Sequence, residues 1–389
     1  MKMRYVFWFS AALVGYSYLG YPVWLWLRVR WSPRPVRRGS WLPSVTAVMV
    51  LCNEEAVIEE KLENLQSLDY PADKFDIVVV SDGSSDRTTA ILDEYALGSR
   101  RGGEVRAEVR TNVRAVIKPS SQGKAAGLND AIQLATGELL FFTDARQHIE
   151  SGALRKLVEN FSDPEVGAAS GELMLGDPSS GETGKGMGVY WRVEKKIREL
   201  ESQSGSVPGA TGAIYCARRE LFGAAPLPEG TILDDVLLPM QVVRRGYRVI
   251  FDARARAWDS PDLGDGREFY RKVRTLSGNY QLLQLAPWLL TSENAIRFEF
   301  ISHKLSRLAV PFALLALLIA SIFLPQPFYR MALGLQLAFY ALSISALVGM
   351  RIGPLSRIAE PARTFLVLNS AAMVAFVNFA TGRKAIWVR

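Results

Sequence analysis

Four apolar segments flank an alternating central region in this 389-residue chain. Residues 5–27 contain no charged side chain, and the same holds for residues 308–324, 331–350 and 364–380. A helix of about 20 apolar residues crosses the hydrocarbon core of a bilayer. The pattern therefore predicts an N-terminal transmembrane helix at 5–27 and about three C-terminal transmembrane helices within 305–381. Buried or re-entrant helices are the alternative for the two shortest runs.

The central region, residues 40–260, alternates short β-branched strands with helices. We predict strands at 45–51, 76–81, 113–117 and 139–143, and helices at 54–68, 86–95 and 123–135. Strand–helix–strand units of this length require parallel strands, so the predicted fold class is α/β with a Rossmann-like sheet. The stretch 97–112, rich in Gly and Arg, is predicted to be an exposed loop.

Charge adds an orientation to this picture. The 46 Lys and Arg residues exceed the 39 Asp and Glu residues, giving a net charge of +7. Several arginines directly follow the first apolar segment, and such flanks stay in the cytoplasm. We therefore expect an integral protein of the plasma membrane with its α/β region in the cytoplasm. The lack of a small-x-small cleavage site favours a retained anchor over a cleaved signal peptide. At the other end, three complete spans would export the basic tail, residues 382–389, whereas the charge rule would keep that tail inside.

The same counts exclude several classes of protein. No nucleic-acid motif accompanies the positive charge, which we assign mainly to contact with anionic membrane lipids. Two cysteines are too few for a disulfide scaffold, and two histidines cannot build a zinc cluster.

Polar side chains follow each predicted strand of the central region. The loops 52–55, 81–86, 121–124 and 143–146 meet at one edge of a parallel sheet, where nucleotides bind. Each loop also has a simpler interpretation. Residues 82–86 fit a plain turn followed by an Asp86 helix cap. Lys124 is a solvated lysine or the partner of a bound anion, and Asp144 is a site carboxylate or an ion-pair partner of Arg146.

Seven segments occur in the order typical of one family. Residues 48–55, 78–86, 123–129, 143–145, 209–215, 233–238 and 269–274 resemble the motifs of family 2 glycosyltransferases. The membrane-embedded branch with cellulose, chitin, hyaluronan and poly-N-acetylglucosamine synthases is the most similar. The resemblance implies a GT-A domain at 40–260 that uses a nucleotide-sugar donor, with UDP favoured over GDP. It also implies a divalent metal and inversion at the anomeric carbon. The amphipathic pattern of residues 269–290 separately predicts interfacial helices at 261–304.

The resemblance assigns roles at the donor. Asn53 and Glu54 would lie beside the nucleotide, Asp82 would bind the base, and Lys124 would approach the diphosphate or ribose. Asp144 matches the first Asp of the metal-binding Asp-x-Asp motif, but Arg146 stands at its third position. We expect Mg²⁺ or Mn²⁺ to be retained, though bound more weakly. The alternative is that Arg146 itself neutralises part of the diphosphate charge.

The resemblance also assigns the acceptor and the leaving group. Asp235 would be the catalytic base, and adjacent Asp234 would raise its pKa. A structural cap of the following helix is the alternative for Asp234. Arg271 and Arg274, three residues apart, would hold the leaving diphosphate unless they only face lipid phosphate. The remaining residues expected on the acceptor side are Glu172, Thr211 and Gly212.

These expectations lead to three hypotheses. The first is a membrane hexosyltransferase that makes or extends an extracellular polysaccharide. The second is transfer of a single sugar to a lipid or polyprenyl-phosphate-linked acceptor, as in ceramide glucosyltransferase-like enzymes. Thr275, where the family has tryptophan, and the small number of spans argue against a processive synthase that acts alone, so an oligomer or an export partner is expected for polymer synthesis. The third is a non-catalytic membrane scaffold.

Overall fold

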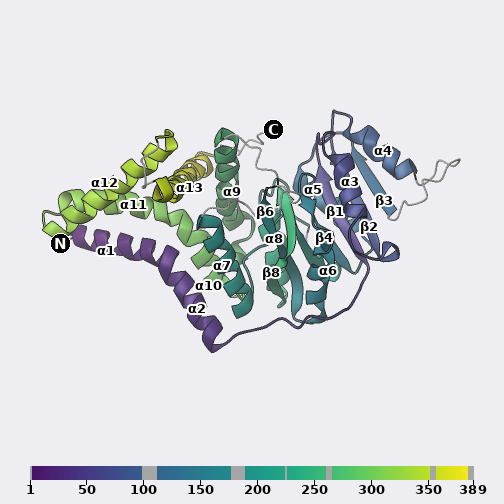
Figure 1. The fold of residues 1–389 in the computed structure, drawn as a ribbon, viewed down its shortest axis with the longest axis horizontal. Coiled ribbons are helices and arrows are strands. Elements are labelled where there is room, and N and C mark those ends of the chain that lie inside the picture. Colours follow the sequence, from purple (N-terminus) through teal and green to yellow (C-terminus); the bar gives the residue numbers. More distant parts are fainter. Residues whose placement is uncertain are drawn as a thin grey trace.

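The computed structural model describes residues 2–98, 112–176, 189–223, 226–259, 265–350 and 356–383. A central sheet lies on one side of the molecule, and a group of long helices extends from it to the other side (Figure 1). The predicted loop 97–112 lies mostly outside the described residues, as does most of the basic tail 382–389.

Within the described residues, eight strands form one mixed sheet in the order β3-β2-β1-β4-β7-β6-β8-β5. The predicted α/β fold is confirmed, since β1 pairs in parallel with β2 and β4, and β2 with β3. The second half of the sheet is antiparallel at β4–β7 and β6–β7. The strands are β1 Val45–Leu51, β2 Phe75–Asp82, β3 Asn112–Lys118, β4 Leu139–Phe142, β5 His148–Ile149, β6 Val166–Leu175, β7 Tyr215–Arg218 and β8 Arg248–Asp259.

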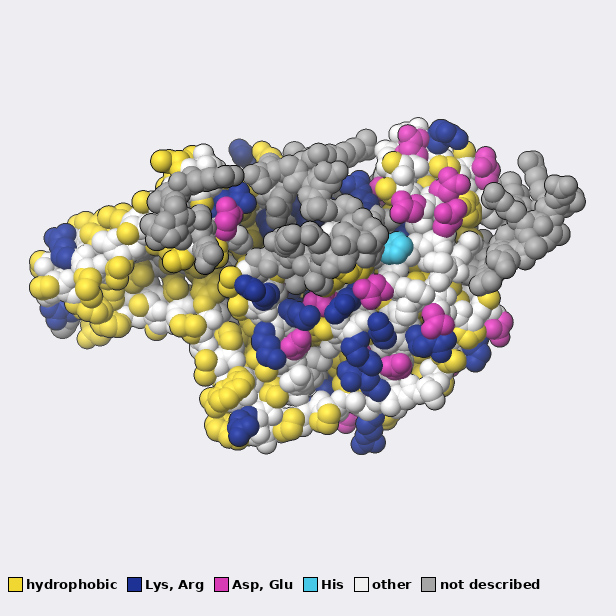
Figure 2. Space-filling model, viewed as in Figure 1, with side chains coloured by type: hydrophobic (Ala, Val, Ile, Leu, Met, Phe, Trp, Pro, Cys, Tyr) yellow, Lys and Arg dark blue, Asp and Glu magenta, His cyan; other side chains and the backbone are white. Residues whose placement is uncertain are grey.

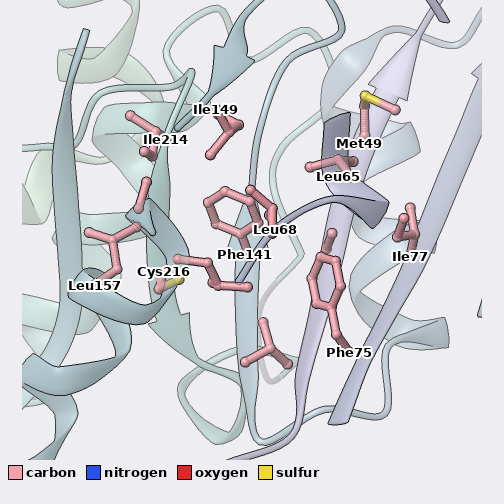
Figure 3. Packing of buried hydrophobic residues seen from close by; sticks show 14 of the residues in the cluster. Met49, Leu65, Leu68, Phe75, Ile77, Phe141, Ile149, Leu157, Ile214 and Cys216 are labelled. Carbon is pink, nitrogen blue, oxygen red and sulfur yellow. The ribbon is translucent and has the colours of Figure 1, made fainter. Parts of the chain in front are cut away.

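Helices cover both faces of this sheet because its strands are apolar on both sides. One face packs against α3 (Ile58–Gln66), α4 (Thr88–Gly98) and α6 (Ala153–Val158). Figure 3 shows this layer, where Phe141 of β4 lies among buried residues such as Leu68 and Ile149. The other face packs against α5 (Lys124–Leu134) and α8 (Asp234–Arg244).

Three helices in the described part of the chain are long and apolar enough to cross a membrane. They are Arg297–Phe323 (α10 Arg297–Phe300, a π-helical turn at Ile301–Leu305, and α11 Ser306–Phe323), α12 Pro327–Leu347, and Ile358–Ala380 within α13 Ser356–Ala380. The predicted number of C-terminal apolar helices is confirmed. The first of these helices begins at Arg297, before the apolar run at 308–324. Its first turns carry charged side chains that form ion pairs with other parts of the protein.

The N-terminal segment is helical from residue 2 to residue 31. It consists of α1 (Lys2–Gly15), a π-helical turn at Tyr16–Gly20, and α2 (Tyr21–Trp31). Side chains such as Phe9, 73% exposed, cover the outer face of α1, and Figure 2 shows hydrophobic side chains gathered over this end of the molecule. The segment is not one of the three helices above, so a membrane span at 5–27 stays a prediction.

Two further helices join the sheet to the apolar helices. Helix α7 (Val189–Ser204) packs against α2 through Tyr21, Leu25, Ile197 and Leu200. Helix α9 (Asp265–Leu285) packs Val273 against α13 at Ala371 and Ala375. The apolar face of α9, expected at a membrane interface, is therefore covered in part by protein.

Candidate active site

The carboxyl ends of the parallel strands bring the predicted polar loops together. Residue pairing continues to Leu51↔Ser81 and Ser81↔Ile117, so the loops that follow these strands begin at the same edge of the sheet. Asn53 has a positive φ of 56°. Its Oδ1 accepts a hydrogen bond from the Ser85 N–H at 2.7 Å, which links the first two loops. In the same turn the Asp86 carboxylate accepts the Thr88 N–H, which confirms the predicted helix cap.

Asp82 fixes the loop that precedes α5. Its carboxylate accepts hydrogen bonds from the Ser121 hydroxyl at 2.7 Å and from the N–H groups of Gln122 and Gly123 at 2.9 and 2.8 Å. The next residue, Gly83, has φ +68°, and a Cβ there would lie 2.3 Å from the Ser121 nitrogen. Only glycine permits this approach. Asp82 is 3% exposed, and its contact with a base stays a prediction.

Lys124 joins two carboxylates from different elements. Its Nζ lies 2.9 Å from Asp144 Oδ1, at the end of β4, and 3.2 Å from Asp234 Oδ2, at the start of α8. Burial lowers the pKa of Lys124. The charges of the two carboxylates raise it by a larger amount, so the pKa lies above its usual value. Asp234, expected on the acceptor side, thus faces Lys124, and no side-chain hydrogen bond caps the helix at this end.

A pocket opens beside this cluster. Helix α9 passes close to the loop before α8, since a Cβ on Gly278 would lie 2.6 Å from Leu233 Cγ. One turn earlier on α9, Arg274 reaches the pocket, whereas Arg271 lies 3.9 Å from Asp259 and is 48% exposed. The lining includes Gly123, Lys124, Thr231, Ile232, Asp234 and Arg274. Two cations and a helix N-terminus therefore face one cavity, an arrangement that suits a phosphate group.

Asp235 lies next to the pocket with its carboxylate against Gly212. A Cβ on Gly212 would lie 3.4 Å from Asp235 Oδ2, and the backbone oxygen of Asp235 accepts the Ala210 N–H at 2.7 Å. Burial and then the charge of Asp234 raise the pKa of Asp235 to about 6. The expected effect of Asp234 on this pKa is confirmed. A carboxylate with this pKa is suited to remove a proton near neutral pH.

Of the residues expected on the acceptor side, Thr211 and Gly212 lie in the loop before β7, and Glu172 lies in β6. Thr211 donates its hydroxyl proton to the Gly171 oxygen at 2.8 Å, and Arg198 donates to Thr211 Oγ1 at 2.7 Å. Glu172 is 5% exposed and pairs with Lys195 at 2.7 Å. Arg198 was not predicted from the sequence. Its signal was the spacing of Glu194, Arg198 and Glu201 on one face of α7.

Arg146 lies beside the loop that follows β1. Its Nε is 3.1 Å from both carboxylate oxygens of Glu54. The alternative ion pair between Arg146 and Asp144 is therefore not formed, and Asp144 pairs with Lys124. Below this turn, buried Lys61 donates to Thr143 Oγ1 at 2.9 Å and to the Gln147 oxygen at 2.6 Å, which closes the loop that carries Asp144.

The carboxylates beside the pocket fit a divalent ion whose other ligands come largely from the substrate. Among the described residues no group of three or more His, Cys, Asp or Glu side chains forms a ready metal cage. Two carboxylates, Asp144 and Asp234, nevertheless converge on one cation, the Lys124 ammonium. Mg²⁺ is commonly bound by one or two carboxylates together with substrate phosphates. Asp144, 39% exposed, is the residue that would reach such an ion.

Comparison with known proteins agrees with this geometry. Residues 46–224 match the family described as "Glycosyl transferase family 2". Over 301 residues the chain is 26% identical to the beta-monoglucosyldiacylglycerol synthase of Synechocystis sp., covering 75% of this chain and 61% of that protein. It is 24% identical over 245 residues to the poly-beta-1,6-N-acetyl-D-glucosamine synthase of Staphylococcus aureus, covering 62% of this chain and 56% of that protein. The chain thus spans about 60% of the length of these relatives.

A solved structure shares the whole fold. The mannosyltransferase PcManGT from Pyrobaculum calidifontis, in complex with GDP-Man and Mn²⁺, superimposes with a TM-score of 0.70 and 22% identity. The similarity covers 97% of this chain and all of that one. The expected hexosyltransferase class agrees with the family match and with this neighbour. Residues 46–224 thus match glycosyl transferase family 2, and they lie in a GT-A-like α/β fold to which long apolar helices are attached.

Proposed function

We propose that this chain is an inverting membrane hexosyltransferase that takes its sugar from a nucleoside-diphosphate sugar. One observation carries the proposal: Asp235, with a pKa raised to about 6, directly follows Asp234, which lines a pocket together with the cations Lys124 and Arg274. A base and a cationic cradle at neighbouring positions are what transfer between a hydroxyl group and a diphosphate ester requires.

Each residue has a distinct task in the proposed reaction. Asp235 takes the proton of the acceptor hydroxyl while the acceptor oxygen bonds to the anomeric carbon. The bond from that carbon to the diphosphate breaks on the opposite face, so the configuration inverts. Lys124 and Arg274 stabilise the negative charge that develops on the leaving nucleoside diphosphate. A divalent ion held by Asp144 would supply further positive charge to the same oxygens.

Two classes of acceptor are candidates for this site. A growing cell-surface polysaccharide is one candidate, in line with the relative named as a poly-N-acetylglucosamine synthase. The second is a lipid or a lipid-linked acceptor, in line with the relative named as a diacylglycerol glycolipid synthase. A specific observation favours the second candidate. Arg198 of α7 donates to Thr211 on the proposed acceptor side, and α7 packs directly against α2 of the N-terminal helical segment.

The cell membrane is the proposed location, with the sheet domain in the cytoplasm. Arg28 and Arg30 lie in the last turn of α2, where positive charge marks the cytoplasmic end of a span.

The proposal is tested with purified protein, a panel of nucleotide sugars, and membrane-lipid or glycan acceptors. We expect one donor to give product and Asp235→Asn to lower transfer about 10²- to 10⁴-fold while donor binding persists. A single organic-extractable product would identify a lipid acceptor, and a ladder of sizes a polysaccharide. Unchanged turnover in Asp235→Asn would refute the assigned base, and lack of donor binding and transfer across the panel would refute the function.

A further inference from the structure

A buried histidine connects the apolar helices to the catalytic domain. His303 lies in the π-helical turn Ile301–Leu305 near the start of the helix Arg297–Phe323, and it is 3% exposed. Its Nδ1 is 2.7 Å from Glu201 Oε1, and its Nε2 is 2.7 Å from Glu194 Oε1. Both glutamates belong to α7, so one imidazole ring joins an apolar helix to two points of the catalytic domain.

Opposite charges meet in this cluster. An ionised carboxylate only accepts hydrogen bonds, so between two ionised glutamates both ring nitrogens donate and the ring is an imidazolium. Arg307 donates to the second oxygen of Glu194 at 2.6 Å, giving two cations for two carboxylates. The Tyr21 hydroxyl of the N-terminal segment also donates to Glu201 Oε1 at 2.6 Å. Removing one member of such a buried set leaves an uncompensated charge, which is strongly unfavourable.

Helix α7 connects the His303 cluster to the proposed acceptor side through Arg198. Arg198 lies four residues after Glu194 and three before Glu201, on the same helical face. Its guanidinium donates to Thr211 Oγ1 at 2.7 Å and to Ser170 Oγ at 3.2 Å. It also stacks over Phe251 at 4.8 Å. A rotation of α7 about its own axis would therefore move Arg198 relative to Thr211.

The residues on either side of Thr211 contact Asp235, the proposed base. The next residue, Gly212, lies against the Asp235 carboxylate, and Ala210 donates its N–H to the Asp235 backbone oxygen. Lys304, which follows His303, acts on the same group, because its charge lowers the pKa of Asp235 against the larger effects of burial and Asp234. The first turns of the helix Arg297–Phe323 thus influence the acceptor side through contacts and through charge.

We propose that His303 is a positioning residue for the acceptor. Clamped between Glu194 and Glu201, it orients α7 so that Arg198 and Thr211 hold the acceptor hydroxyl in line with Asp235. This inference rests on the proposed function, and it places the acceptor on the α7 side of Asp235, with the donor in the Lys124–Arg274 pocket.

The test compares His303→Gln with His148→Gln, the only other histidine of the chain, in detergent-purified full-length protein. Transfer rates are measured against acceptor and donor concentration, and nucleotide binding is measured separately. We expect His303→Gln to lower kcat/KM for the acceptor about tenfold or more, with donor affinity unchanged. His148→Gln should match the wild type in both. Wild-type acceptor kinetics in His303→Gln, or an equal loss for donor and acceptor, would overturn the proposal.

A double-mutant cycle covers the case in which His303→Gln folds poorly. Tyr21→Phe removes one hydrogen bond to Glu201 but keeps the ring, and Thr211→Val removes the far end of the connection. Their effects on acceptor kcat/KM should be non-additive, because both act through α7. Strict additivity would contradict the connection. If the wild type transfers no sugar from any donor, the proposed function fails; if it transfers sugar and these variants behave as the wild type, only the role of His303 fails.

Discussion

The Lys124 ammonium lies 2.9 Å from the Asp144 carboxylate and joins the first turn of α5 to the end of β4. Two motifs that are twenty residues apart in the chain thus form one charged centre. Asp234 completes it from α8 at 3.2 Å. Because carboxylates already hold this lysine in place, it would need little reorganisation to meet the diphosphate of the proposed donor.

Lys124→Met should weaken donor binding. A charged hydrogen bond to phosphate contributes about 1.5–3 kcal/mol, so we expect the donor Kd to rise by about one to two orders of magnitude. Titration of the nucleotide sugar by calorimetry measures the change. Lys196→Met is the matched control, since Lys196 is 62% exposed and pairs with Glu199. An unchanged donor Kd in Lys124→Met would remove this lysine from the donor site.

The transfer rate should depend on pH through Asp235. The base acts in its ionised form, and its pKa is raised to about 6 by burial and by Asp234. We therefore expect kcat/KM for the acceptor to fall about tenfold per unit below pH 6 and to level off above it. Asp234→Asn removes one cause of the raised pKa, so the acidic limb of the profile should move to lower pH. A limb that stays in place would show that the two carboxylates are not coupled.

Arg274 and Arg271 should differ in importance. Arg274 lines the pocket, whereas Arg271 is half exposed and faces Asp259 at 3.9 Å. Removing one preorganised donor to a developing negative charge costs about 10²–10³ in kcat. We expect this loss for Arg274→Gln and a much smaller one for Arg271→Gln. Initial rates at saturating donor distinguish the two, and equal losses would place both arginines at the diphosphate.

Removal of divalent metal should reduce transfer and donor affinity together. Asp144 is partly exposed and would share an ion with the diphosphate, so most of the ion's ligands come from substrate and water. Dialysis against a chelator should lower the rate and raise the donor Kd, and added Mn²⁺ or Mg²⁺ should restore both. Asp144→Asn should lower the donor affinity measured with metal present. It should also abolish most of the change in rate and donor Kd that chelation and added metal cause. Full activity after exhaustive chelation would show that Lys124 and the arginines neutralise the diphosphate alone.

Lys61 should make stability depend on pH. Burial lowers its pKa to about 7 in the folded protein, whereas an unfolded lysine titrates near 10.4. Between these values the unfolded chain binds more protons, so the free energy of unfolding rises with pH across this window. Thermal melts from pH 7 to pH 9 should show a gain in the wild type that Lys61→Met lacks. Parallel curves for the two proteins would contradict the lowered pKa.

Local patterns accounted for the first half of the sheet. The predicted strand at 45–51 coincides with β1, and the predicted strands at 76–81 and 113–117 each lie within the observed strand, which adds one residue at either end. Runs of β-branched residues bounded by turn residues are strong local signals. The predicted helix at 54–68 began too early, since α3 starts at Ile58. The preceding residues form a turn in which the Thr88 hydroxyl oxygen accepts a hydrogen bond from the Glu54 N–H. The spacing of residues in the sequence does not reveal this contact.

The sequence by itself determined which residues end the parallel strands, and therefore that Asn53, Asp82 and Asp144 lie along one edge of the sheet. Only the tertiary structure decided their partners. Asp82 binds the loop before α5, Asp144 binds Lys124, and Arg146 turns to Glu54 rather than to Asp144. The clamp of His303 between two glutamates of α7 was equally hidden. Periodicity reports which face of an element is buried, but ion pairs between elements depend on how those elements pack in space.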